Sequence, residues 1–209
     1  YETLKSKKTK LVSWVYSWDN LYQSNIIKSS DLIFVWSDYF KKIAKKIHNI
    51  DHNKIKTLGP VQLDYLKTKI RISKKKKNYI LFACSYGSDF KSTGDNFIKD
   101  EIEFLKILSE ILKNFNSDLL ILVRPYPSAN PKSYNELKKI NNIKIEEYGN
   151  LIKRGNKSSE KIRFERRLES KINQIINASI VISFGSTFNI EASYLNKIVF
   201  HINYSPIKS

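Results

Sequence analysis

Short apolar runs alternate with longer amphipathic stretches along this chain, and this alternation constrains its fold more than any other feature. Several runs place Val, Ile, Leu or Phe at consecutive positions, as strands that are buried on both faces of a sheet do. Strands that alternate with helices in this way are typical of a mostly parallel sheet with helices on both faces. We therefore predict an α/β fold. The predicted strands are 11–16, 32–36, 54–59, 79–84, 119–124, 143–147, 180–184 and 198–202.

The stretches between these runs predict the covering helices. Residues 38–48 read as a helix with Asp38 as its N-cap, because a short acidic side chain can accept a hydrogen bond from a free amide there. Residues 97–115 have apolar side chains at helical spacing, at positions 98, 102, 105, 108 and 112. Further helices are expected at 131–140, 164–178 and 187–195.

The chain has 209 residues, enough for one full domain with an appendage. It contains no methionine, not even at position 1, so we expect it to start inside a longer chain or to have been processed. The single cysteine, Cys84, lies in an apolar run. It excludes an intrachain disulfide, favours a cytoplasmic setting and is expected to act as a small buried hydrophobe.

The net charge of +17 raises the alternative of a basic domain that binds nucleic acid or a membrane surface. The lysines are scattered along the chain, however, and this makes nucleic acid the less favoured partner. A basic surface also suits anionic nucleotides and the anionic face of a membrane, where lipid-linked acceptors reside. No apolar run reaches the roughly 20 residues that are needed to cross a bilayer, and we expect a protein that is at most peripheral to the inner membrane face.

The strongest local signal is a glycine-serine-threonine turn between the strand at 180–184 and the helix at 187–195. Gly185 allows a sharp turn, and Ser186 and Thr187 place hydroxyls beside the free amides of the helix start, which suits a diphosphate. The alternative is that Ser186 or Thr187 only caps the helix. Glu191 follows one turn later, so its carboxylate can accept hydrogen bonds from a ribose diol or, alternatively, only interacts with the helix dipole.

Two further strand ends carry polar side chains. Arg124 ends the run at 119–124, and its planar guanidinium suits phosphate oxygens, although a strand-end arginine also often pairs with an acid. Tyr126 follows within a rigid Pro-Tyr-Pro segment. Ser85 and Tyr86 follow the run at 79–84 and suit a polar ligand.

A fourth group follows the first predicted strand. Asp19 is a candidate catalytic base toward an acceptor hydroxyl, and Trp18 suits stacking on a sugar ring. The alternative is a local turn with a core tryptophan. His48 and His52 lie in a basic stretch that we expect at the surface, and no spacing of histidines suggests a metal site.

The order of VSWVYSWDNL, YILFACSYG, LLILVRPYP and SFGSTFNIEASYLNKIVFHI resembles that of bacterial surface-polysaccharide glycosyltransferases of the GT-B type. Among these, the chain is similar to capsule and surface-carbohydrate enzymes related to the CDP-glycerol glycerophosphotransferases. The resemblance spans about residues 11–205.

This resemblance implies two Rossmann-like domains with an active site between them. Residues 1–57 would be the end of an acceptor-side domain, and residues 58–209 a donor-side domain. The turn at Gly185, Ser186 and Thr187 would hold the donor diphosphate without a tightly bound metal or cofactor, and Glu191 would contact the ribose. Arg124 matches a strand end of the Arg-Pro-His-Pro kind, but Tyr126 stands where histidine is usual.

The expected function is transfer of a sugar from a UDP-, CDP-, GDP- or CMP-linked donor. Transfer of a polyol phosphate is less favoured. The acceptor would be a surface glycan or a lipid-linked molecule. Arg124 would stabilise the leaving diphosphate. The resemblance implies that acceptor binding and the catalytic base lie outside this chain. A sugar-nucleotide epimerase of the same fold is the alternative enzyme.

Overall fold

The computed structural model describes residues 9–17, 19–23, 30–68, 78–85, 97–126, 131–146 and 168–203. It divides into two compact units, Tyr1–Thr68 and Lys69–Ser209. Within the described residues, no helix is long and apolar enough to cross a membrane. The sequence placed the division between residues 57 and 58, whereas the first unit of the structure also contains the helix α4 (Val61–Thr68).

The first unit contains a parallel three-stranded sheet in the order β1 (Val12–Trp14), β2 (Leu32–Val35), β3 (Ile55–Thr57). Its other described elements are α2 (Asn20–Gln23), α3 (Asp38–His48), a 3₁₀ turn, η1 (His52–Lys54), and α4. Its core consists of apolar side chains from these strands and helices, with Ile33 and Ile55 fully buried.

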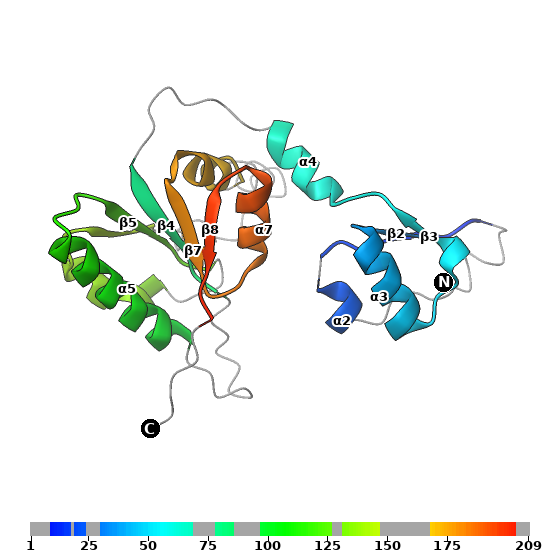
Figure 1. The fold of residues 1–209 in the computed structure, drawn as a ribbon, viewed down its shortest axis with the longest axis horizontal. Coiled ribbons are helices and arrows are strands. Elements are labelled where there is room, and N and C mark those ends of the chain that lie inside the picture. The colour runs from blue at the N-terminus through cyan, green and yellow to red at the C-terminus, as the bar shows by residue number, and fades with distance from the viewer. Residues whose placement is uncertain are drawn as a thin grey trace, which may run out of the picture. The chain divides into compact units, whose positions relative to one another are not determined.

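The second unit contains a five-stranded sheet in which all pairs are parallel (Figure 1). Its strands lie in the order β6 (Ile143–Ile145), β5 (Leu120–Arg124), β4 (Tyr79–Ala83), β7 (Ile180–Ser183), β8 (Ile198–His201). Within this unit, the central strand β4 comes first in the sequence. The next two strands, β5 and β6, lie on one side of it, and the last two, β7 and β8, lie on the other. The strand order therefore reverses between β4 and β7.

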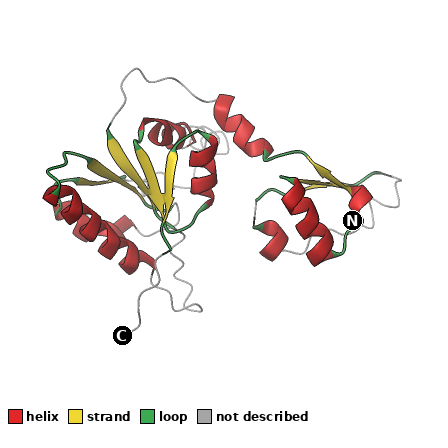
Figure 2. Cartoon of the chain, viewed as in Figure 1, coloured by secondary structure: helices red, strands yellow, loops and turns green. Residues whose placement is uncertain are grey.

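Helices cover both faces of this sheet (Figure 2). The α5 helix (Phe97–Asn114) and the 3₁₀ helix η2 (Pro131–Lys139) contribute to the core on one face. A helix at 168–177 and α7 (Thr187–Tyr194) contribute to the core on the other. All five residues of β4 are buried, as expected for the middle strand of a covered parallel sheet. The predicted α/β class is confirmed.

Two local expectations were wrong. The N-cap of α3 is Ser37, whose extended backbone precedes the helix and whose hydroxyl accepts a hydrogen bond from the Phe40 amide. Asp38 instead belongs to the first turn, and its carboxylate accepts a hydrogen bond from Thr57. His48, expected at the surface, is buried with its Nε2 atom 2.7 Å from the Leu21 carbonyl oxygen.

Candidate functional site

The carboxyl ends of all five strands of the second unit meet at one edge of its sheet, because the strands are parallel. Pairing of β4 with β5 extends to Ala83 and Arg124. Pairing of β4 with β7 stops one residue earlier on β4, at Phe82 and Ile182. The β4–β7 pairing thus stops one residue before the β4–β5 pairing. The strand order reverses between β4 and β7, and open α/β sheets hold their ligands at such a point.

Ser85 stands where β4 leaves the sheet. Its amide donates a hydrogen bond to Glu101 Oε1, with a distance of 2.5 Å between the two atoms. The preceding Cys84 amide bonds to the Arg124 carbonyl oxygen on the β5 side, so in a regular ladder the Ser85 amide would face β7. The Ser85 hydroxyl is buried and makes no hydrogen bond of normal geometry within the described residues. Tyr86 lies outside the described residues.

Glu101 of α5 is a fully buried carboxylate beneath this strand end. Its Oε2 atom accepts a hydrogen bond of 2.6 Å from the Tyr134 hydroxyl. Burial raises the pKa of the Glu101 carboxyl, although the hydrogen bonds from Tyr134 and Ser85 oppose that rise. Burial and the neighbouring Glu101 also raise the pKa of the Cys84 thiol well above its ordinary value. Cys84 is therefore a protonated, buried thiol, as expected for a structural cysteine.

The glycine-serine-threonine turn connects β7 to α7. Gly185 has φ +126°, a conformation that L side chains rarely adopt, and a Cβ atom there would also make a tight contact of 3.0 Å with His201 Cε1. The Gly185 amide donates to Ser183 Oγ at 3.2 Å. Ser186 is the N-cap of α7, and its hydroxyl accepts a hydrogen bond from the Phe188 amide. The predicted alternative of a capping role is thus real for Ser186.

Capping by Ser186 does not use all of the amides at this helix start. The Phe188 amide bonds to Ser186 Oγ, and the Asn189 amide bonds to the Ser186 carbonyl oxygen. Within the described residues, the amides of Ser186 and Thr187 make no hydrogen bond. Two backbone donors therefore remain at the positive end of the helix dipole, an arrangement suited to an anion.

Glu191 projects from α7 toward the helix at 168–177. Its Oε1 atom lies 2.8 Å from Lys171 Nζ, and both side chains are mostly buried, at 14% and 21% exposed for Glu191 and Lys171. The carboxylate is therefore held by a cation from a neighbouring helix. Sequence analysis singled out Glu191 but not Lys171.

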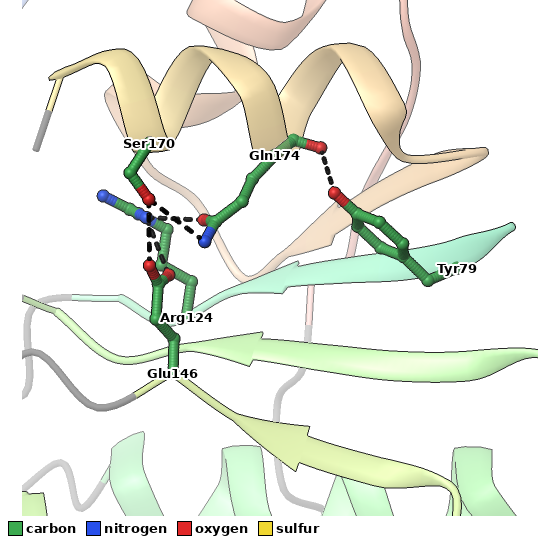
Figure 3. A network of polar contacts seen from close by, with 5 residues as sticks. All are labelled: Tyr79, Arg124, Glu146, Ser170 and Gln174. Carbon is green, nitrogen blue, oxygen red and sulfur yellow. Dashed lines mark hydrogen bonds and ion pairs between the residues drawn. The ribbon is translucent and has the colours of Figure 1, made fainter. Parts of the chain in front are cut away.

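Arg124 lies at the centre of a polar network on the same face (Figure 3). Its Nη1 atom lies 2.8 Å from Glu146 Oε2 and 2.5 Å from Gln174 Oε1. The Ser170 hydroxyl donates a hydrogen bond to the other Glu146 oxygen. The alternative in which Arg124 pairs with an acid is therefore what the structure shows, with the Arg124 side chain only 10% exposed.

The structure also brings Arg124 close to the start of α7. The guanidinium carbon is 6.0 Å from the centre of the Phe188 ring, which belongs to the first turn of α7. Leu122, which lies two residues before Arg124 on β5, packs against the core cluster that contains Phe188. The cation of Arg124 and the turn that begins α7 thus share one face of the sheet at its carboxyl edge.

The other two predicted site residues are Tyr126 in the second unit and Asp19 in the first. Tyr126 lies two residues after β5, is half-buried and interacts with at least one other residue. Asp19 belongs to the first unit, where its carboxylate accepts a hydrogen bond from the Ser17 hydroxyl in the turn that begins α2. The described part of the chain contains no group of three His, Cys, Asp or Glu residues that could hold a metal ion.

Glu101 is the buried polar residue that sequence analysis missed, although a signal existed. It lies three residues after Ile98 and four before Leu105, so it interrupts the apolar face of α5. A charged residue at such a position is either paired or functional. Lys171 carried no comparable signal, because its partner Glu191 is 20 residues away in the sequence.

Comparisons with known proteins show a shared fold. Two structures of a UDP-GlcNAc 2-epimerase from Methanocaldococcus jannaschii match with TM-scores of 0.55 and 0.54, at 19% and 16% identity. They cover 81% and 95% of this chain, and 44% and 55% of their own. A wall teichoic acid polymerase, TagF, matches with a TM-score of 0.48 at 18% identity, covering 90% of this chain and 43% of its own.

No protein-family model matches the chain, and no curated protein sequence is significantly similar to it. The chain spans about half the length of the epimerase chains that it matches. At these identities the epimerase comparisons show a likeness of fold alone. This chain has an α/β fold of the Rossmann-like kind.

Proposed function

We propose that the second unit binds the nucleotide diphosphate part of an activated sugar and that the chain is part of a glycosyltransferase. The observation that carries this proposal is the placement of Arg124 beside the first turn of α7, 6.0 Å from the Phe188 ring. The amides of Ser186 and Thr187 at the start of that helix make no hydrogen bond to any described residue, and Ser85 stands at the same edge of the sheet. Backbone donors, a cation and the reversal of strand order are together typical of a diphosphate site.

In this proposal, the amides of Ser186 and Thr187 bind the diphosphate, and Arg124 provides a fixed positive charge nearby. Because Glu146 already accepts a hydrogen bond from Arg124, the cation is held in position before a ligand arrives. Preorganised donors of this kind stabilise negative charge as it develops on a leaving diphosphate. Glu191 is proposed to contact the ribose and Tyr126 to line the same edge.

The proposed acceptor is a surface glycan or a lipid-linked molecule. This part rests on the resemblance of the sequence motifs and on the net charge of +17, which suits both an anionic donor and an anionic membrane leaflet. Asp19 is proposed as a base toward the acceptor hydroxyl. If the chain transfers a sugar to an acceptor, the release of free nucleotide from the donor should depend on the presence of that acceptor.

The binding step is tested by removing one amide without disturbing the helix. Thr187 is the first residue of α7, and the preceding Ser186 has extended backbone angles of φ −162° and ψ 153°. Proline is accepted at such a position, and an extended residue is compatible with a following proline. Thr187→Pro therefore removes one N–H donor, whereas Thr187→Ala removes the hydroxyl and keeps the donor.

We expect UDP, CDP, GDP or CMP to raise the melting temperature of the wild-type chain, since a ligand that binds only the folded state stabilises it. Calorimetry should show that Thr187→Pro weakens the selected nucleotide about 10-fold, equivalent to about 1.4 kcal/mol. Thr187→Ala should bind within about threefold of wild type. Equal affinities of Thr187→Pro and wild type would contradict a role for this amide.

A sugar-nucleotide epimerase is the second candidate, because two structures that match with TM-scores above 0.5 are those of a UDP-GlcNAc 2-epimerase. Both candidates bind a nucleotide sugar at the same sheet edge, so binding alone does not separate them. An epimerase would convert the donor sugar in the absence of any acceptor. Analysis of the products after incubation with the donor alone distinguishes the two reactions.

A further inference from the structure

A buried carboxylate lies under the point at which β4 and β7 separate, and the proposed function does not use it. Glu101 is fully buried, and within the described residues no Lys, Arg or His forms an ion pair with it. Its two oxygens accept hydrogen bonds from the Ser85 amide and the Tyr134 hydroxyl. A buried charge without a cation is costly to the fold, so its presence at a strand end calls for a role beyond packing.

The contact between Glu101 and Ser85 changes the path of β4. In the described part of the chain, the Cys84 amide is the last amide of this strand end that bonds across to β5. The following Ser85 amide bonds to Glu101. On the opposite strand, the Gly185 amide bonds to the buried Ser183 hydroxyl. Of these two amides, that of Ser85 is the one that would continue the ladder with β7, and it is turned to a side chain where this pairing has stopped.

Ser85 and Gly185 stand level with each other at this edge. Ser85 lies three positions after Phe82, the last residue of β4 that pairs with β7, and Gly185 lies three positions after Ile182, the last residue of β7 that pairs with β4. Holding the Ser85 amide away from β7 therefore keeps the backbone of β4 from continuing the ladder beside the Gly185 turn. The ladder cannot close over the position at which the diphosphate is proposed to bind.

We infer that Glu101 is a positioning residue that holds the end of β4 away from β7 and so keeps the nucleotide site open. This inference rests on the proposed nucleotide site. Glu101 does not touch the ligand in this role, because its side chain is fully buried between α5, β4 and η2. It acts through the Ser85 amide.

Three variants of the full 209-residue chain test the inference. Glu101→Gln keeps an oxygen that can accept from the Ser85 amide, whereas Glu101→Leu has a similar size and no acceptor. Glu101→Asp keeps the charge but withdraws it by one methylene. Ser109→Ala is the matched control, because Ser109 is a buried residue of the same helix that donates a 2.6 Å hydrogen bond to Asn142, away from Ser85.

Titration with UDP and with CDP gives the affinity of each variant. We expect Glu101→Leu to weaken the bound nucleotide at least about 10-fold, with Glu101→Asp also weaker, and Glu101→Gln to stay within about threefold of wild type. Ser109→Ala should lose stability without losing affinity. Equal affinity in folded Glu101→Leu or Glu101→Asp, or an equal loss in Ser109→Ala, would overturn the positioning role.

Amide hydrogen exchange at Ser85 separates this inference from the proposed function. If the wild-type chain binds none of UDP, CDP, GDP and CMP, the proposed function fails, yet the Ser85 amide should still exchange faster in Glu101→Leu and Glu101→Asp than in wild type. Glu101→Asp provides this measurement if Glu101→Leu does not fold. Unchanged exchange at Ser85 would overturn the inference whatever the nucleotide result.

Discussion

Lys171 Nζ lies 2.8 Å from Glu191 Oε1, and this ion pair ties the helix at 168–177 to α7. Glu191 follows Thr187 by four residues, so the paired carboxylate rises on the side of the helix that carries the start of the proposed site. The pair thus connects a fold-stabilising contact with a residue proposed to bind ribose.

Glu191→Ala should weaken nucleotide binding about 10-fold or more, equivalent to at least about 1.4 kcal/mol, because the ribose loses its acceptor. The stability cost should be about 1 to 2 kcal/mol, between the values for exposed and buried ion pairs. Calorimetry and urea denaturation measure the two effects separately.

Lys171→Met is the control for that variant. It breaks the same ion pair but leaves the Glu191 carboxylate in place, so nucleotide affinity should stay within about threefold of wild type. Equal losses of affinity in Lys171→Met and Glu191→Ala would show that only the ion pair matters.

Arg124→Met should destabilise the chain by about 3 kcal/mol, because it leaves the mostly buried Glu146 carboxylate without its cation. The double variant Arg124→Met with Glu146→Leu should regain most of this stability, since neither charge then remains. Urea denaturation of the wild type and both variants tests this expectation.

The same two variants test the role of Arg124 in binding. Nucleotide affinity should be low in Arg124→Met and should stay low in the double variant, even though the double variant is stable. Recovery of affinity together with stability would show that Arg124 contributes only to the fold.

The sequence predicted the strands better than the contacts between side chains. Every observed strand lies inside a predicted range, because strands buried in a parallel sheet carry continuous apolar runs that are visible locally. The helix α4 was missed, since its residues have little helical amphipathicity. The turn at Gly185 was recognised from residue types whose conformational roles are local.

Pairings between distant residues were beyond reach of the same reasoning. Arg124 was predicted at a strand end, but Glu146 and Gln174 are 22 and 50 residues away from it. Only the register of β5 with β6 and the packing of the helix at 168–177 bring them together. A candidate site can therefore be recognised from strand ends, while the partners of its charged residues require the structure.

The pKa of Glu101 gives a prediction about pH. Because the folded-state pKa is raised above the ordinary value of 4.5, folding favours the protonated form, and ionisation costs stability as pH rises through the raised pKa. Glu101→Gln removes this ionisation and keeps an acceptor for the Ser85 amide. The variant should therefore gain stability relative to wild type at pH 7, and this gain should shrink below pH 4.5.

Urea denaturation at pH 4 and at pH 7 measures this difference. A matched pH series of Glu110→Gln, an exposed acid on the same helix, should show no such trend. A gain for Glu101→Gln that is the same at both pH values would indicate that its effect comes from packing and not from ionisation.

Gly185→Ala separates conformational strain from steric contact at the turn before α7. Gly185 has φ +126°, where a side chain is strained, and an added Cβ would also lie 3.0 Å from His201 Cε1. The combined cost should be about 1 to 3 kcal/mol. His201→Ala removes the ring but not the strain, so Gly185→Ala should cost less, though still a measurable amount, when introduced into His201→Ala. The turn also sets the direction of the Ser186 and Thr187 amides, so Gly185→Ala should weaken nucleotide binding both in the wild type and in His201→Ala. Full affinity in the double variant Gly185→Ala with His201→Ala would show that only the His201 contact makes glycine necessary for the site.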